Sequence, residues 1–376
     1  MIVKTESKEY KIEFINTNNY KQISDLILEN VNFTQAVIIT ESNIPNEYSD
    51  LLAKELRSRG VSVEIIKLES KGETNKSFKI LENLLSQIFT ITKPTRKMKI
   101  IAIGGGVIGD LAGFAASILM RGVGFIQIPT TLLAMTDSSI GGKTGINAFD
   151  LKNVIGSFYQ PDFVLINSYF LQTLNYNEYI SGYTEIIKHA IIDNSDKLFE
   201  LLIQNSDKIR SRNSEFMSMI LHKSCAVKSR IVEQDEFETK GIRATLNFGH
   251  TIAHAIEKLP ELNEKILHGT AVGLGMIYEL KIAEKLSILE TQEIIEKLEM
   301  SFQSLEIPTK ISQLININNS EKLIDLMIEK MLVDKKNIHS IGESEISFSL
   351  PVELGMMKNI SIPRSQCVQL LGEIIS

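Results

Sequence analysis

Residues 98–117, MKIIAIGGGVIGDLAGFAAS, decide the fold predicted for this chain. An apolar run typical of a buried strand leads into a glycine-rich turn, which is followed by residues with helical periodicity. Gly104, Gly106 and Gly109 match the pattern G-x-G-x-x-G at this point. Glycines allow the backbone to approach a pyrophosphate, and free N–H groups at a helix start favour negative charge. The stretch therefore predicts a strand–turn–helix unit that holds a dinucleotide at residues 104–110.

One feature of the ordinary dinucleotide-binding fold is absent from this sequence. An acidic residue about 20 positions further on usually binds the ribose, but residues 122–131 contain no acid. The alternative interpretation is a tight turn without a ligand. Because the turn lies directly between a strand and a helix, we expect a dinucleotide that is held by a different set of contacts.

Outward from this unit, the first part of the chain alternates short β-rich runs with helical patterns. Helices are expected at residues 46–59, 77–89 and 110–120, and a hairpin-like opening at 1–15 is expected to add an edge strand. Strands are expected at residues 36–41, 61–68, 98–103, 124–129 and 163–166. This alternation predicts βαβ units and a mainly parallel sheet.

After about residue 166 the pattern becomes almost wholly helical. Helices are expected at residues 185–192, 197–202, 216–232, 251–258, 270–286, 291–301 and 320–333, with one short β-rich stretch at 345–350. We therefore predict an N-terminal α/β nucleotide-binding domain over residues 1–168 and an all-α C-terminal domain over residues 169–376.

Length and composition are those of a globular protein with a large core. The 376 residues fit two or three domains, and 43% are hydrophobic. The net charge of −6 argues against a nucleic-acid partner. Two cysteines in no metal-binding spacing favour a reducing compartment. The sequence has neither a signal-peptide pattern nor an apolar run long enough to cross a membrane, so a cytoplasmic location and no membrane partner are expected.

A second stretch rich in glycine and polar residues is IPTTLLAMTDSSIGGKTGIN, residues 128–147. Small residues around Lys143 suit an anion or a polyhydroxylated ligand, because close backbone approach and a point charge act together. A flexible surface loop is the alternative. We favour the ligand site because apolar runs flank the segment, and Lys152 and Asn153 are expected to extend the same pocket.

The helical half contains a candidate metal site. Glu185, Lys188 and His189 share one helix face, and His250 and His254 share another. Three of the six histidines cluster between positions 250 and 268. Two histidines and one carboxylate form a recognised catalytic zinc set. A lone H-x-x-x-H pair is more often incidental than metal-binding, so the clustering of histidines is what favours a metal site at Glu185, His250 and His268. Spacing does not decide the role of His254.

Taken together, these stretches resemble the 3-dehydroquinate synthase family of the sugar-phosphate cyclases. The resemblance runs from about residue 72 to residue 355. It is carried by GGGVIGDLAGFAAS, MRGVGFIQIPTTLLAMTDSSIGGKTGIN, KNVIGSFYQP, TEIIKHAII, RATLNFGHTIAHAIE and LHGTAVGLGM. It implies a dehydroquinate synthase-like fold, tightly bound NAD and a divalent metal, zinc or cobalt. A homodimer is also implied, with Arg121 reaching toward the other subunit.

The reaction that the resemblance implies is that of a phosphate lyase of the shikimate pathway to aromatic amino acids. It converts the sugar phosphate 3-deoxy-D-arabino-heptulosonate 7-phosphate into 3-dehydroquinate and phosphate. The implied steps are transient oxidation by NAD, phosphate elimination, reduction and an intramolecular aldol. Another sugar-phosphate cyclase, such as a 2-deoxy-scyllo-inosose or epi-valiolone synthase, is one alternative. A second alternative is a metal-dependent alcohol or glycerol dehydrogenase. A third is an inactive homologue that only binds a ligand.

The resemblance also assigns roles to residues at matching positions. It implies metal ligation by Glu185, His250 and His268, and catalytic roles for Lys188, His254, Lys143 and Asp137. Substrate contacts are implied for Arg121, Lys152, Asn153, Lys228, Arg243, Asn247 and, of two adjacent lysines, Lys336 in preference to Lys335. NAD contacts are implied for Glu73, Lys76, Gly104, Gly105, Gly106, Gly109, Asp110, Thr130, Thr131, Lys143, Lys152 and Thr173.

Three positions depart from the family pattern. Thr270 stands in LHGTAV where the family usually has glutamate. A carboxylate there could orient the neighbouring histidine, so the substitution bears on metal affinity. The segment DEFETKGIR is one residue longer than usual, which makes Glu238 the match for a family glutamate, and His189 replaces a more typical tyrosine.

Overall fold

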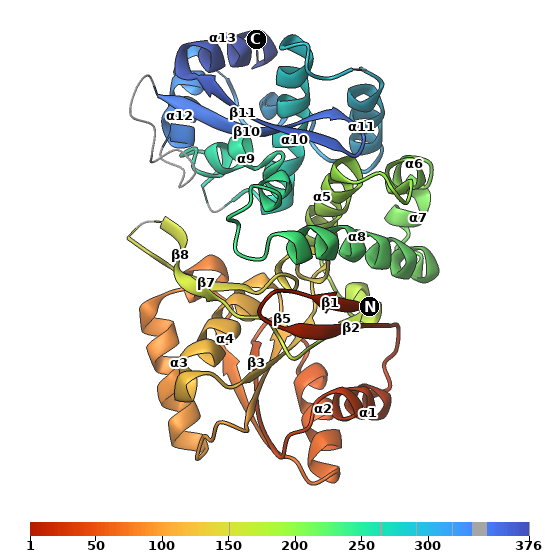
Figure 1. Cartoon of the computed structure of the whole chain (residues 1–376), viewed down its shortest axis with the longest axis vertical. Helices are drawn as coiled ribbons and strands as arrows, with labels where there is room; N and C mark the ends of the chain where they lie inside the picture. Colours follow the sequence, from red (N-terminus) through yellow and green to blue (C-terminus); the bar gives the residue numbers. More distant parts are fainter. Residues whose placement is uncertain (150, 264, 291, 318, 333–343, 376) are drawn as a thin grey trace. The chain divides into compact units, whose positions relative to one another are not determined.

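A computed structural model describes the whole chain except residues 150, 264, 291, 318, 333–343 and 376. The described chain forms two compact units (Figure 1). Unit 1 consists of Met1–Leu174 and Met217–Phe237, and unit 2 consists of Asn175–Phe216 and Glu238–Ser376. The expected division at residue 168 lies close to the first crossing between the units. The return of Met217–Phe237 to unit 1 was not expected, because a helical pattern does not reveal which core a helix joins.

Unit 1 is built on a seven-stranded sheet. Its strand order is β1 (Ile2–Lys4), β2 (Glu9–Ile15), β9 (Phe163–Asn167), β6 (Gly124–Pro129), β5 (Lys99–Gly104), β3 (Gln35–Glu41) and β4 (Ser62–Leu68). Only the pair β1–β2 is antiparallel among these neighbours. The prediction of a mainly parallel sheet with an N-terminal edge strand is therefore confirmed.

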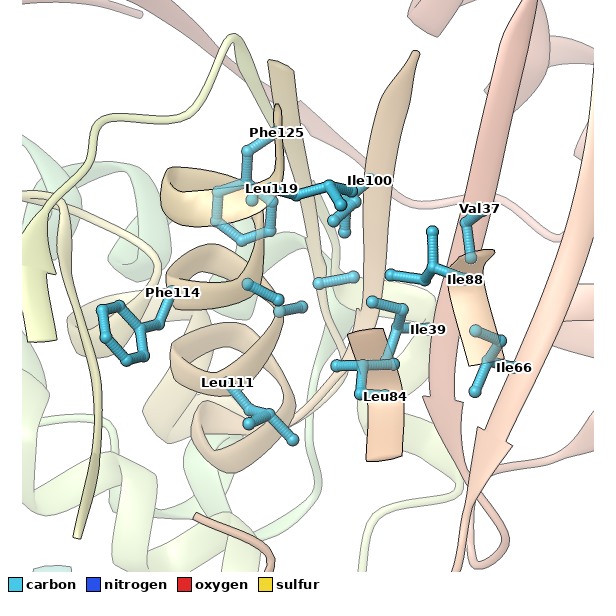
Figure 2. Packing of buried hydrophobic residues seen from close by; sticks show 14 of the residues in the cluster. Val37, Ile39, Ile66, Leu84, Ile88, Ile100, Leu111, Phe114, Leu119 and Phe125 are labelled. Atoms are coloured by element: carbon cyan, nitrogen blue, oxygen red, sulfur yellow. The ribbon is translucent and has the colours of Figure 1, made fainter. Parts of the chain in front are cut away.

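Unit 1 also contains helices. They are α1 (Tyr20–Asn30), α2 (Asn46–Ser58), α3 (Phe78–Ile91), α4 (Gly106–Ile118) and most of α8 (Ser214–Gln234). Figure 2 shows the apolar side chains of α3 and α4 packed against strands β3, β4 and β5, where Leu84, Leu111 and Ile100 are fully buried. Helix α4 begins at Gly106, earlier than the expected Asp110, so two glycines of the motif lie inside its first turns.

A second sheet in unit 1 was missed by the sequence interpretation. Strands β7 (Lys143–Ala148) and β8 (Leu151–Phe158) form an antiparallel hairpin where we expected a ligand-binding loop. Its glycines and polar residues hide the usual alternation of a strand. The hairpin carries Lys143, Lys152 and Asn153, so the residues singled out from this segment lie on its two strands.

Unit 2 is mainly helical, as predicted, but also contains a β-hairpin. Its helices are α5 (Tyr176–Ile192), α6 (Leu198–Ile203), α7 (Ser206–Arg210), α9 (His250–Glu257), α10 (His268–Lys285), α11 (Glu293–Ser304), α12 (Ser320–Leu332) and α13 (Arg364–Ile375). The expected strand at 345–350 is β10 (Glu345–Glu353), and it pairs with an unexpected strand, β11 (Met356–Pro363). The all-α expectation is corrected to this extent, because the hairpin partner has no clear alternation of polar and apolar residues.

Helix α5 is unusual in being buried on all sides. Every residue from Tyr179 to Ile192 is buried, which explains why only its last part had a recognisable pattern. None of the described helices is long and apolar enough to cross a membrane.

Candidate active site

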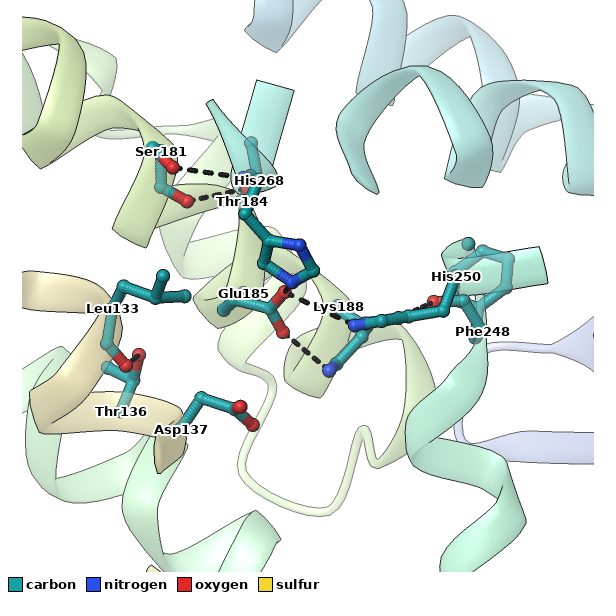
Figure 3. Close-up of polar contacts among 12 residues, drawn as sticks. Leu133, Thr136, Asp137, Ser181, Thr184, Glu185, Lys188, Phe248, His250 and His268 are labelled. Atoms are coloured by element: carbon teal, nitrogen blue, oxygen red, sulfur yellow. Dashed lines mark hydrogen bonds and ion pairs between the residues drawn. The ribbon is translucent and has the colours of Figure 1, made fainter. Parts of the chain in front are cut away.

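Three helices of unit 2 bring Glu185, His250 and His268 together (Figure 3). Glu185 lies on α5, His250 is the first residue of α9, and His268 is the first residue of α10. Their ligand atoms all lie within 4.8 Å of one another. Glu185 Oε1 is 3.7 Å from His250 Nε2 and 3.5 Å from His268 Nε2. The structure thus assembles the trio that the sequence analysis singled out.

The close approach of α10 to α5 depends on Gly269. A Cβ at this position would overlap the carbonyl oxygen of Ser181 and crowd the hydroxyl of Thr184. The Gly269 N–H instead donates to Ser181 Oγ at 2.9 Å. Helix α10 can therefore place His268 beside Glu185 only with glycine at its second position.

The start of α9 is stabilised by a glycine turn and a buried carboxylate. Gly249 precedes His250 with a φ of +80°, a conformation that L side chains rarely adopt. Its N–H donates to the fully buried carboxylate of Glu279 on α10, at 2.7 Å to Oε2. The other carboxylate oxygen of Glu279 accepts from the Ile252 N–H at 3.4 Å. A buried anion at a helix start satisfies free N–H groups and opposes the helix dipole, so Glu279 stabilises the turn that carries His250.

Both histidines of the trio have an acceptor at Nδ1. His250 Nδ1 lies 3.2 Å from the carbonyl oxygen of Phe248, and His268 Nδ1 lies 3.3 Å from Glu257 Oε1. An acceptor at Nδ1 keeps the proton there, which leaves the Nε2 lone pair free. Both Nε2 atoms point toward Glu185, so the tautomers favour ligation of a common ion.

The electrostatics of the trio are dominated by Glu185 and Lys188. Lys188 Nζ lies 2.5 Å from Glu185 Oε2, and both side chains are almost fully buried. Burial opposes ionisation of Glu185, but Lys188 and the two histidines outweigh it and hold the pKa of the carboxyl well below its usual range. Burial and the charge of Lys188 lower the pKa of His250 well below its usual range.

His268 behaves differently from His250. Burial disfavours its protonation, but hydrogen bonds to Glu185 and Glu257 outweigh this effect and raise the pKa of His268 to about 10. A cation is therefore favoured at this imidazole, whether a proton or a metal ion supplies the charge.

The donor set fits a divalent transition metal. Both carboxylate oxygens of Glu185 are buried, and their close neighbours are nitrogen atoms of Lys188, His250 and His268. Two imidazoles and one carboxylate with room for a further ligand are the set found in catalytic zinc sites. Imidazole also suits cobalt, whereas magnesium and calcium prefer all-oxygen sites.

Other residues singled out in unit 2 lie on α9 or in the short turn that precedes it. The His254 ring centroid is 5.5 Å from that of His250 and 6.3 Å from that of His268. His254 is thus next to the trio but outside the ligand cluster. Arg243 is buried, with Nε 3.7 Å from Glu238 Oε1, and Asn247 ends the same short turn before α9. Lys335 and Lys336 lie outside the described residues.

In unit 1 the glycine motif forms the junction of β5 and α4. Gly104 ends the strand, and α4 starts at Gly106 without a side-chain cap on its free N–H groups. A Cβ at Gly105 would meet Thr131 at 3.2 Å. Thr130 and Thr131 directly follow β6, the neighbouring parallel strand. The motif residues and the two threonines therefore lie at adjacent carboxyl ends of the sheet.

A cluster of charged residues adjoins this junction. Lys76 is buried, and its Nζ lies 2.7 Å from Asp110 Oδ2 and 3.8 Å from Glu73 Oε2. It also donates to the side-chain oxygen of Asn153 on β8. Burial lowers the pKa of Lys76, but the carboxylates of Asp110 and Glu73 outweigh it and raise that pKa.

The remaining singled-out residues of unit 1 occupy several elements. Lys228 on α8 donates to Asp137 Oδ1 at 2.6 Å, and Asp137 lies on a π-helical turn, Ala134–Ser138. The Thr173 hydroxyl is 2.8 Å from that of Tyr48 on α2. Arg121 has a φ of +66° in the turn before β6. The structure thus pairs Lys76 with Asp110 and Lys228 with Asp137, while Arg121 and Thr173 lie elsewhere in the unit.

Two acidic residues near the trio were not singled out from the sequence. Glu257 contacts His268, and Glu279 contacts the start of α9. Glu257 lies seven positions after His250 on one helix, a spacing that places both residues on the same face. That spacing was a usable signal for Glu257, but no local pattern links Glu279 to Gly249.

Solved structures share the fold of this chain. The chain matches 2-epi-5-epi-valiolone synthase from Streptomyces hygroscopicus subsp. jinggangensis, which was crystallised with NAD⁺ and Zn²⁺, with a TM-score of 0.83 and 22% identity over 100% of this chain and 99% of that one. It matches 2-deoxy-scyllo-inosose synthase, complexed with carbaglucose-6-phosphate, NAD⁺ and Co²⁺, with a TM-score of 0.82 and 23% identity over 99% of each chain. The fold is that of the sugar-phosphate cyclases.

Sequence comparison gives the family within this class. Residues 66–181 match the family of 3-dehydroquinate synthase N-terminal domains, and residues 182–337 match the corresponding C-terminal domains. The chain is 36% identical to 3-dehydroquinate synthase of Caldanaerobacter subterraneus subsp. tengcongensis over 99% of both proteins. The chain belongs to the 3-dehydroquinate synthase family of enzymes.

Proposed function

We propose that this enzyme converts 3-deoxy-D-arabino-heptulosonate 7-phosphate into 3-dehydroquinate and phosphate, using NAD and a divalent metal. The observation that carries the proposal is the convergence of Glu185, His250 and His268, whose ligand atoms lie within 4.8 Å of one another in a chain of this family. The reaction is the second step of the shikimate route to aromatic amino acids.

Glu185, His250 and His268 would hold the metal, and zinc or cobalt fits their donor atoms. Zn²⁺ and Co²⁺ are the ions in the two cyclase structures of the same fold. NAD would be held at the start of α4 by Gly104, Gly105, Gly106 and Gly109, with Glu73, Lys76, Asp110, Thr130, Thr131, Lys143, Lys152 and Thr173. When bound, NAD supplies a reversible hydride acceptor and the metal supplies a Lewis acid for a substrate oxygen.

The chain's own cations would bind the phosphate and carboxylate of the substrate. Lys143 and Lys152 on the β7–β8 hairpin, and the buried Arg243, carry charge suited to these anions. Further contacts are proposed for Arg121, Asn153, Lys228, Asn247 and Lys336. The carboxylate of Asp137 fixes the position of the Lys228 ammonium, because the two are joined by an ion pair of 2.6 Å.

Proton handling is proposed for Lys188 and His254. Lys188 is buried beside Glu185, with its Nζ 2.5 Å from Glu185 Oε2. His254 lies one turn after His250 on α9, with its ring 5.5 Å away by centroids. His254 lies outside the ligand cluster, and we propose that it accepts and returns a proton during the reaction.

The direct test is a phosphate-release assay with heptulosonate phosphate, NAD and zinc, run with and without a chelator. We expect phosphate release that the chelator abolishes, with no net NADH because the hydride returns to the product. Stoichiometric accumulation of NADH would instead identify an alcohol dehydrogenase. Phosphate release from another sugar phosphate, but none from heptulosonate phosphate, would identify a sister cyclase.

A homodimer in the cytoplasm is part of the proposal. The two cysteines, Cys225 and Cys367, are both buried and unpaired, as suits a reducing compartment. Light scattering on the purified chain tests the dimer, and a monomeric mass for the active enzyme would contradict it.

A further inference from the structure

The last residue of α9, Glu257, contacts the imidazole of His268. Its Oε1 lies 3.3 Å from His268 Nδ1, and its side chain is 10% exposed. We propose that Glu257 is the positioning residue that orients His268 for the metal and sets metal affinity. This inference rests on the proposed metal site.

Helix geometry makes Glu257 suitable for this task. His250 and Glu257 begin and end α9, seven residues apart and so about two turns along one face. One helix thereby carries a proposed ligand and the carboxylate that holds the next ligand. His268, at the start of α10, lies beside this face, where it contacts Glu257.

The two histidines differ in what holds them. His250 Nδ1 faces the main-chain carbonyl of Phe248, which no substitution removes, whereas His268 Nδ1 faces a side chain. Glu257 also brings negative charge, which increases the basicity of the imidazole as a ligand. Orientation and ligand strength at His268 therefore both depend on Glu257.

The same contact explains how the site tolerates Thr270. The resemblance leads us to expect a glutamate at position 270 that could orient His268. In this chain the carboxylate at His268 Nδ1 comes from α9 instead, while Thr270 lies half-buried two residues into α10. His268 therefore has a carboxylate partner although position 270 is threonine.

Zinc affinity of the full-length protein tests the inference without measuring activity. Apo protein would be titrated with Zn²⁺ in competition with a chromophoric chelator, and the absorption spectrum of the Co²⁺ form would report ligand geometry. We expect Glu257→Ala to weaken zinc binding by about 10–100-fold and to alter the cobalt spectrum. Glu257→Gln keeps the shape and an acceptor oxygen but loses the charge, so its affinity should fall between those of Glu257→Ala and the unaltered chain.

Matched variants separate the possible outcomes. Glu261→Gln removes the charge of an exposed glutamate just beyond α9 and should leave affinity unchanged. His268→Ala should weaken binding more than Glu257→Ala does. If His268→Ala lowers affinity while both Glu257 variants bind zinc like the unaltered chain, the role of Glu257 is wrong and the metal site stands. If His268→Ala also binds zinc normally, the proposed metal site itself is wrong. Should Glu257→Ala fail to fold, the isosteric Glu257→Gln decides the question.

Discussion

The proposed cofactor site of unit 1 and the proposed metal site of unit 2 are constructed differently. In unit 1 a continuous stretch, from Gly104 at the end of β5 to Asp110 on α4, supplies glycines and free backbone N–H groups. In unit 2 three side chains come from α5, α9 and α10, and 83 positions separate the first, Glu185, from the last, His268 (268 − 185). The first construction depends on local backbone conformation, whereas the second depends on helix packing.

This difference has a consequence for mutation. A site made of backbone groups keeps its shape as long as the strand–turn–helix unit is folded. A site made of side chains on separate helices loses its geometry when any one contact between the helices changes, because packed interiors do not deform smoothly. The metal site should therefore be sensitive to packing residues that touch no ligand.

The largest expected effect comes from the carboxylate ligand itself. Glu185→Gln should lower phosphate release by about 10³-fold or more, because a Lewis acid contributes several kcal/mol to such a reaction. Initial rates with added zinc measure it. Glu296→Gln, on the exposed face of α11, is the control and should be fully active. A fully active Glu185→Gln enzyme would refute the metal assignment.

The next effect tests the dependence on helix packing. Gly269→Ala should destabilise unit 2 by roughly 3 kcal/mol and weaken zinc binding, because the new Cβ meets the main-chain oxygen of Ser181, which cannot rotate away. Urea unfolding by circular dichroism, without metal, measures the stability. Gly372→Ala on α13 is the matched control, since a Cβ there meets nothing within 4 Å; it should be neutral or stabilising by about 0.5–1 kcal/mol. If Gly269→Ala and Gly372→Ala are equally stable, the metal site does not depend on the close packing of α10 against α5.

A smaller effect is expected at the charged cluster of unit 1. Lys76→Met leaves the Asp110 carboxylate without its ion-pair partner. The expected cost is about 2 kcal/mol, below the roughly 3–5 kcal/mol of a fully buried pair because Asp110 keeps some exposure. NAD affinity by calorimetry should fall as well. Lys76→Met/Asp110→Asn should recover part of the stability, and Lys79→Met on the exposed side of α3 should change neither quantity.

The smallest effect is expected from a helix-capping residue of unit 1 that lies outside the proposed cofactor site. Asn19 Oδ1 accepts from the N–H groups of Lys21 and Gln22 at the start of α1. Asn19→Ala should cost about 1 kcal/mol in urea unfolding and leave NAD and zinc affinity unchanged. If it weakens NAD binding as much as Lys76→Met does, the effect of Lys76 reflects general stability and not a cofactor contact.

Local patterns were sufficient for much of unit 1. Strand β6 was predicted with its observed ends, and β3, β4, β5 and β9 within a residue or so, because apolar runs bounded by glycine or polar turns identify strands in a parallel sheet. The β7–β8 hairpin was missed because its glycines and polar side chains mask the alternation. The first half of α5 was missed because a helix buried on all sides has no polar face.

The sequence by itself determined the alternation of helices with the strands of the parallel sheet, the glycine motif at residues 104–110, the family resemblance and the choice of Glu185, His250 and His268. These features are encoded in short stretches whose spacing reflects strand, turn and helix geometry. Only the tertiary structure decided that α8 joins unit 1, that Gly269 allows α10 to reach α5, that Glu257 contacts His268 and that Glu279 contacts the start of α9. These facts depend on contacts between segments far apart in the chain, which the packing of the whole core selects and no local pattern records.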